Sequence, residues 1–301
     1  MTGDTTTAIP EFRSEFTTRE SLRVQTADRV CFTVVFLRVQ RWDAPVVVIV
    51  PVMAMKAKNY YSLAKALRAQ GLSVATCDLR VHGEATAKLG ERTDFGYREM
   101  IEIDLPAIVA AVEERFPCAP MHLFGHSLGG RLALLFCVVE PGRTAGVTVI
   151  GTGMVFWWAF GPRRWWEALS LLQWIGLVSR VKGPWPGGVL IPAPMPGGVM
   201  IDWSVHSLTS CYRPGGSSRR YNSLLAAMGL PVLVISLSQD VLGPTSSVDF
   251  LVSRLPAAEV SRLDIDENST VANRDHFRWV EDAPAIAVGV ADWITTGSAP
   301  A

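Results

Sequence analysis

The segment Gly125-His126-Ser127-Leu128-Gly129 lies between two apolar stretches, residues 121–124 and residues 128–139. The first stretch is typical of a short buried strand, and the second is long enough to form a helix. Glycines on both sides allow a sharp strand-to-helix turn, in which the central residue adopts a strained conformation and projects above the sheet. Ser127 is therefore the candidate nucleophile, although a serine in this position also suits an ordinary helix N-cap.

The order of the acidic and histidine residues after Ser127 supports its interpretation as a nucleophile. Of the five histidines, His276 alone follows a plausible acid, as required by the order nucleophile, acid, histidine. That acid is Asp240, which comes three residues after the apolar run 231–237. Catalytic groups of parallel sheets gather at the carboxyl ends of strands, so we expect Ser127, Asp240 and His276 to meet there. The histidines that cannot take this role without breaking the order are His82, His122, His126 and His206.

Other carboxylates compete with Asp240 for the role of the acid. Asp249 falls within the next expected helix, whereas Asp264 and Asp266 lie on or just after a later expected strand. Asp240 is also compatible with a simple turn before Gly243. Its place at the end of a strand favours it as the partner of the histidine.

Acyl-transfer chemistry also requires N–H donors that stabilise the developing oxyanion. The amide that follows the nucleophile, that of Leu128, supplies the first donor. We expect the second in the loop 51–55, which follows the apolar strand 45–50. Pro51 has no N–H, and within this loop we select the amide of Met53.

These features resemble the alpha/beta-hydrolase superfamily, and within it serine hydrolases of the lysophospholipase or monoacylglycerol-lipase-like kind. The resemblance covers about residues 20–295 and also rests on residues 59–61 and 78–83. Pro51-Val52 replaces the usual His-Gly of the oxyanion strand, and Val81 and Ala85 interrupt the usual Arg-Gly-His-Gly-x-Ser motif. The resemblance implies a mostly parallel, doubly wound sheet with an inserted helical lid.

Apolar runs alternate with helical patterns along the chain, as in βαβ units that form a parallel sheet. We expect a loose lead-in at residues 1–20, a catalytic domain at 21–152 and 231–301, and a lid at 153–230. The expected strands are residues 22–25, 30–39, 46–50, 72–77, 121–124, 146–150, 231–237 and 259–265. The expected helices are residues 61–69, 97–116, 128–139, 246–255 and 284–294.

The expected lid differs in composition from the rest of the chain. Seven of the ten tryptophans fall in residues 153–230. Such rings suit a pocket for an apolar part of a substrate, and we assign Trp157 and Trp158 to substrate binding. The same rings are also suited to a small core within the lid. Arginines flank this segment, so a peripheral membrane contact is a weaker alternative.

Composition excludes several other classes of protein. The 28 basic and 28 acidic residues balance, so nothing favours nucleic-acid binding. Five cysteines without Cys-x-x-Cys spacing indicate reduced thiols and no metal site. No apolar run reaches the roughly 18 residues of a membrane span, and the polar N-terminus does not resemble a signal peptide. We therefore expect a cytoplasmic protein.

The sequence thus leaves three classes of function. The first is a serine hydrolase acting through Ser127 on small-molecule esters with an apolar acyl or alcohol part, without a cofactor. The second forms the same acyl-enzyme but transfers the acyl group elsewhere, as a thioesterase, cyclase or acyltransferase does. The third is a non-catalytic binding protein of the same fold, which the presence of all three triad residues disfavours.

Overall fold

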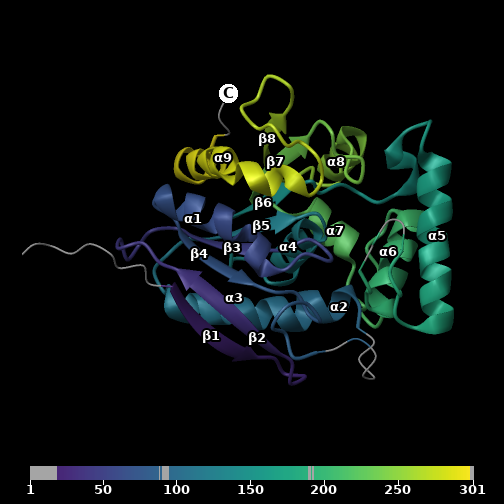
Figure 1. The fold of residues 1–301 in the computed structure, drawn as a ribbon, viewed down its shortest axis with the longest axis horizontal. Helices are drawn as coiled ribbons and strands as arrows, with labels where there is room; N and C mark the ends of the chain where they lie inside the picture. The colour runs from purple at the N-terminus through teal and green to yellow at the C-terminus, as the bar shows by residue number, and fades with distance from the viewer. Residues whose placement is uncertain (1–18, 88, 90–94, 189–190, 192, 299–301) are drawn as a thin grey trace, which may run out of the picture.

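A computed structural model describes residues 19–87, 89, 95–188, 191 and 193–298 of the chain. At its centre is an eight-stranded sheet with the order β1-β2-β4-β3-β5-β6-β7-β8 (Figure 1). The strands are β1 (Arg19–Gln25), β2 (Cys31–Leu37), β3 (Val46–Val50), β4 (Ser73–Cys77), β5 (Met121–His126), β6 (Gly146–Ile150), β7 (Pro231–Leu237) and β8 (Glu259–Ile265). β1 and β2 form an antiparallel hairpin whose second strand is antiparallel to β4, and the remaining neighbours are parallel.

Burial follows the position of each strand in the sheet. β3, β4, β5 and β6 are buried along their whole length, which fits their mostly apolar sequences. β1 is the edge strand and exposes nearly all of its side chains. The expected lead-in lies outside the described residues up to residue 18, and Arg19 and Glu20 already belong to β1.

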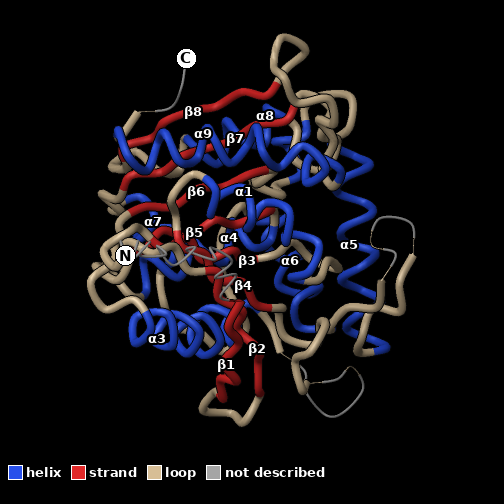
Figure 2. Tube along the Cα trace, turned by 60° about the vertical axis from the view of Figure 1, so that its left-hand side comes forward, coloured by secondary structure: helices blue, strands red, loops and turns tan. Residues whose placement is uncertain are grey.

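Helices cover both faces of the sheet. The right-handed connections from β3 to β4 and from β4 to β5 run in opposite directions, so they place α1 and α3 on opposite faces. α1 packs against α9, and α4 lies on the same side as α3 (Figures 1 and 2). These helices are α1 (Tyr61–Ala69), α3 (Leu105–Arg115), α4 (Leu128–Val139) and α9 (Ala283–Thr296). The shorter elements of the core are η1 (Ala57–Tyr60), α2 (Tyr97–Glu99), η2 (Met100–Asp104), α8 (Thr245–Val252) and η4 (Arg278–Asp282).

The helix expected over residues 97–116 contains an irregular turn. Its first residues form α2, and the wider π-helical turn η2 separates them from α3. Pro106 lies at the start of α3 and has no N–H to donate to the carbonyl of Glu102. The wider turn accommodates the proline ring, which the apolar periodicity alone does not predict.

In its described residues, the connection between β6 and β7 carries four further helices. They are η3 (Trp157–Phe160), α5 (Trp165–Lys182), α6 (Gly197–Thr209) and α7 (Tyr221–Ala226). α5 and α6 pack along each other at one side of the molecule, whereas α7 packs against α4 of the core (Figure 1). Among the described residues, no helix is both long enough and apolar enough to cross a membrane.

Candidate active site

Ser127 occupies the turn between β5 and α4 with a backbone strained for a serine, at φ 53° and ψ −110°. The two flanking glycines are required by close packing. A Cβ on Gly125 would collide with the backbone of Gly130, and one on Gly129 would collide with the carbonyl of Val50. The Ser127 side chain makes no capping hydrogen bond to α4, so its hydroxyl is not used as an ordinary N-cap.

The structure brings Ser127, His276 and Asp240 together in a hydrogen-bonded chain. His276 Nε2 lies 3.0 Å from Ser127 Oγ, and His276 Nδ1 lies 2.7 Å from Asp240 Oδ2. The amides of Leu242 and Gly243 donate to Asp240 Oδ1 at 2.8 and 2.7 Å, which fixes the carboxylate. With a carboxylate facing Nδ1, the proton resides on that nitrogen and Nε2 is free to accept the serine proton.

The rival carboxylates lie elsewhere. Arg262 donates to Asp249 at 2.6 Å and to Asp264 at 3.3 Å, on the exposed side of the sheet edge. Asp266 accepts the amide of Asn268 in an exposed turn. No hydrogen bond joins any of these three carboxylates to His276 in the described part of the chain, so the geometry favours Asp240.

The loop after β3 runs beside Ser127 and contains Met53. In the described part of the chain, neither the amide of Met53 nor that of Leu128 donates to a protein acceptor. The amides on either side of Met53 are both fixed by side chains. Val52 N–H donates to Tyr60 Oη at 3.0 Å, and Ala54 N–H donates to His82 Nε2 at 3.2 Å.

His82 binds this loop as a neutral imidazole with a defined tautomer. Its Nδ1 donates to the carbonyl of Arg80 at 3.0 Å, which leaves Nε2 as the acceptor for Ala54. Burial lowers the pKa of His82 below its ordinary value and so favours this neutral form. The positive φ of Ala54, 67°, marks the tight turn that this contact stabilises.

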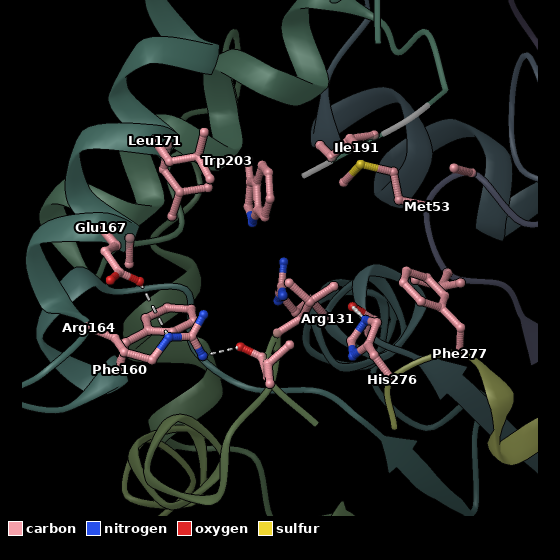
Figure 3. Close-up of a pocket in the computed structure, with 17 residues that line it drawn as sticks. Met53, Arg131, Phe160, Arg164, Glu167, Leu171, Ile191, Trp203, His276 and Phe277 are labelled. Carbon is pink, nitrogen blue, oxygen red and sulfur yellow. Dashed lines mark hydrogen bonds and ion pairs between the residues drawn. The ribbon is translucent and has the colours of Figure 1, made fainter. Parts of the chain in front are cut away.

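A pocket of about 850 Å³, its open mouth included, extends from Ser127 and His276 toward α5 and α6 (Figure 3). Its walls are mainly apolar. The large apolar side chains that line it include Phe160, Leu171, Leu172, Ile191, Trp203 and Phe277. At the mouth, Arg164 pairs with Glu167 at 3.7 Å and donates to the carbonyl of Val241 at 2.9 Å.

Trp157 and Trp158 lie outside this pocket, contrary to the expectation from sequence. The Trp157 ring packs edge-on against Trp158 and also contacts Phe156 and Trp165. Trp158 is 61% exposed. The short helix η3 turns the two rings toward each other and the Trp157 ring toward the start of α5, so the aromatic residues of the segment 153–230 that line the pocket are Phe160 and Trp203 instead.

Sequence reasoning also missed Arg131, which lines the pocket four residues after Ser127. A signal was present, because Arg131 is the one charged residue in the otherwise apolar helix α4. We also searched the structure for side chains that could bind a metal ion. Within the described ranges, no group of three or more His, Cys, Asp or Glu side chains is arranged to hold a metal ion.

Comparison with known sequences gives two partial matches. The model of the family described as serine aminopeptidase, S33, matches residues 43–185, a segment that contains Ser127 but ends before Asp240 and His276. Monoglyceride lipase from Homo sapiens is 32% identical over 92 residues, covering 31% of this chain. The match spans only 29% of the lipase, so the two proteins are compared over less than a third of their lengths.

Comparison with solved structures covers nearly the whole chain at low identity. A carboxyl esterase from Bacillus coagulans has a TM-score of 0.66, with 17% identity over 92% of this chain and 97% of the esterase. Alpha/beta hydrolase domain-containing protein 10 from mouse has a TM-score of 0.64, with 14% identity over 93% and 100% of the two chains. Est1E from Butyrivibrio proteoclasticus, solved with ferulic acid, has a TM-score of 0.61, with 12% identity over 91% and 100%.

These matches agree with the topology described above. The predicted fold class, a mostly parallel and doubly wound sheet of the alpha/beta-hydrolase type, is confirmed. The family match adds a sequence relationship around the turn that carries Ser127. The chain therefore has the alpha/beta-hydrolase fold, and over residues 43–185 its sequence is similar to the serine aminopeptidase, S33, family.

Proposed function

We propose that this protein is a serine hydrolase that cleaves carboxylic esters with an apolar acyl or alcohol part. The observation that carries the proposal is the chain from Ser127 through His276 to Asp240, at the base of a mainly apolar pocket. Nucleophile, base and orienting acid are each within hydrogen-bonding distance of the next, as covalent acyl-transfer catalysis requires.

In the first half of the reaction, Ser127 Oγ attacks the ester carbonyl carbon while its proton passes to His276 Nε2. The carbonyl oxygen becomes an oxyanion, which the amides of Met53 and Leu128 stabilise by hydrogen bonds. The tetrahedral intermediate then expels the alcohol, which takes the proton from His276. The acyl group stays on Ser127 as an ester, and Asp240 stabilises the imidazolium that forms in between.

In the second half, water replaces the alcohol. His276 takes a proton from the water as its oxygen attacks the acyl carbon, and the second tetrahedral intermediate releases the acid and restores Ser127. The segment 153–230 acts as a lid in this proposal. It supplies Phe160, Leu171 and Trp203 to the pocket and thereby selects the apolar part of the substrate.

The test is covalent labelling with a fluorophosphonate, followed by intact-mass measurement. The wild-type protein should gain one label and hydrolyse nitrophenyl esters. Ser127→Ala should lose both properties while remaining folded, with turnover reduced by about 10³-fold or more. Labelling of Ser127→Ala at the wild-type rate would assign the reactive nucleophile to another residue.

A further inference from the structure

Arg131 places a buried positive charge in the same pocket as Ser127. It projects from α4, and only 4% of it is exposed. Its Nε–H donates to the carbonyl of Gly153 at 3.0 Å, which holds the guanidinium in place. Figure 3 shows the Arg131 side chain between Trp203 and His276, with its nitrogens turned toward the indole of Trp203.

This charge has no counter-charge among the described residues. No ion pair to an acidic side chain is formed by Arg131 in the described ranges, where its guanidinium binds the carbonyl of Gly153 and lies against the hydroxyl of Tyr97. Arg80 shows the contrast. It is 2% exposed and is paired with both Asp28 and Asp104. A buried charge without a counter-charge is strongly destabilising. The lack of an ion pair at Arg131, in contrast to Arg80, therefore indicates that Arg131 binds a ligand.

Neutral donors surround this guanidinium. Trp203 Nε1 is buried and has no hydrogen-bond partner among the described residues, and the buried hydroxyl of Tyr97 lies beside the guanidinium. Burial raises the pKa of Tyr97, and the positive charge of Arg131 only partly opposes that increase, so Tyr97 is not the missing anion. Burial likewise keeps the pKa of His206 well below its ordinary value. The carboxylate of Asp202 also acts on Tyr97, but it accepts the amides of Tyr97 and Gly215, and on the pocket wall the donors near Ser127 are Arg131 and the N–H of Trp203.

The geometry points to an anion subsite at Arg131 that binds a carboxylate carried by the ester substrate, with Trp203 Nε1 as a second donor. The proposal rests on the proposed esterase function, because it narrows the substrate class of that same pocket. With Nε bound to Gly153, the two terminal nitrogens of Arg131 remain available to a carboxylate in the bidentate manner. A single positive charge matches a carboxylate better than a phosphate dianion.

The apolar walls specify the rest of the ligand. Leu171, Leu172 and Ile191 line the pocket that Ser127 and Arg131 share, and they suit a short methylene chain between the reacting ester and the distant carboxylate. The substrate class is therefore an ester whose acyl or alcohol part ends in a carboxylate. Hemiesters of aliphatic dicarboxylic acids are the simplest members.

The first experiment uses the wild-type protein. Nitrophenyl hemiesters of succinate, glutarate and adipate are compared with neutral nitrophenyl esters of equal acyl length, after subtraction of spontaneous hydrolysis. A second arm compares butyrate esters of ω-hydroxy acids with those of the corresponding alcohols. In at least one of these two comparisons, kcat/KM for the anionic ester should exceed that for the neutral ester by about 10-fold or more, as expected for charge-assisted hydrogen bonds. Equal values in both arms would overturn the subsite.

Variants then assign the preference to the guanidinium. Arg131→Met should reduce the ratio of anionic to neutral kcat/KM by about 10- to 100-fold, Arg131→Lys by less, and Trp203→Phe by about 3-fold. Arg143→Met serves as the matched control, because Arg143 pairs with Glu113 away from the pocket. An unchanged ratio in Arg131→Met would overturn the proposal. If Arg131→Met does not fold, the ratio of anionic to neutral kcat/KM in the wild type and in Trp203→Phe tests the proposal instead.

Failure of the subsite and failure of the esterase function give different results. Fluorophosphonate labelling and turnover of neutral esters without an anionic preference would reject the subsite alone. If no ester is hydrolysed, calorimetric titration of wild-type protein and Arg131→Met with monomethyl adipate tests the subsite independently. Tighter binding to the wild type supports the subsite, and equal binding rejects it.

Discussion

Trp279 donates its indole N–H to His126 Nε2 across 3.4 Å. Because a tryptophan N–H can only donate, Nε2 is the acceptor and Nδ1 of His126 carries the proton. That proton points to Tyr60 Oη at 2.7 Å, which also accepts Val52 N–H and directs its own proton toward the sulfur of Met55. A buried chain of hydrogen bonds therefore connects the residue before the nucleophile to the loop after β3. Burial holds the pKa of His126 well below its ordinary value, so the chain stays neutral.

Tyr60→Phe should lower kcat by about 3- to 10-fold with little change in KM, because the buried Val52 N–H loses its acceptor and the amide of Met53 is less firmly placed. Kinetics with a nitrophenyl acetate substrate measure both constants. Tyr61→Phe is the matched control, since it removes the neighbouring hydroxyl from the surface of α1. If the two variants have the same kcat, the hydrogen bond from Val52 does not position the oxyanion donor.

Asp240→Asn should reduce kcat by about 10³- to 10⁴-fold, because an amide no longer fixes the tautomer of His276 or stabilises its protonated form. Asp264→Asn, which alters an exposed carboxylate on strand β8, should stay within about 2-fold of the wild type. Steady-state hydrolysis of a short ester compares the two variants. Near-normal turnover by Asp240→Asn would mean that another group orients the histidine.

The arrangement of Ser127, Asp240 and His276 could be anticipated because the sequence marks the first two positions locally and His276 is the one histidine that follows both. Ser127 has a glycine pattern between a strand and a helix, and Asp240 follows the last residues of β7. The order of parallel strands then brings their carboxyl ends to one edge. Central strands were also predictable, because both their faces are buried and their sequences are mostly apolar.

The pocket could not be predicted in the same way. Which face a tryptophan presents depends on how η3, α5 and α6 pack, and Trp157 and Trp203 look equivalent in the sequence. The structure places Trp203 in the pocket and turns Trp157 toward Trp165. The π-helical turn at Met100–Asp104 was missed for a related reason, since helical periodicity does not report a local change in hydrogen bonding.

Acidification should destabilise the fold, in part through His122. This side chain lies in β5 against the ring of Trp293, and burial lowers its pKa from 6.5 to about 4. Below pH 6.5 the unfolded chain binds a proton that the folded protein does not accept until about pH 4. The free energy of unfolding should therefore fall as pH decreases through this window, by about 2 kcal/mol between pH 7.5 and 5 from this one group.

Urea unfolding at the two pH values tests the contribution of His122. His122→Gln cannot titrate, so its loss of stability on acidification should be smaller than that of the wild type by about 2 kcal/mol. The other buried histidines are common to both proteins and cancel in the comparison. Identical pH dependence would show that His122 is protonated in the folded state.

Phe160→Ala should impair hydrolysis of long-chain esters more than that of acetate esters, because Phe160 lines the apolar pocket beyond Ser127. The lost ring contact is worth about 1 to 3 kcal/mol to a chain that reaches it, so octanoate esters should lose roughly 10-fold in kcat/KM relative to acetate esters. Trp158→Ala is the control, since Trp158 belongs to the same short helix η3 but is largely exposed and lies outside the pocket. It should leave the ratio unchanged. Equal losses on both esters in Phe160→Ala would mean that this ring only stabilises the helices over the site, and the apolar substrate part would have to bind elsewhere.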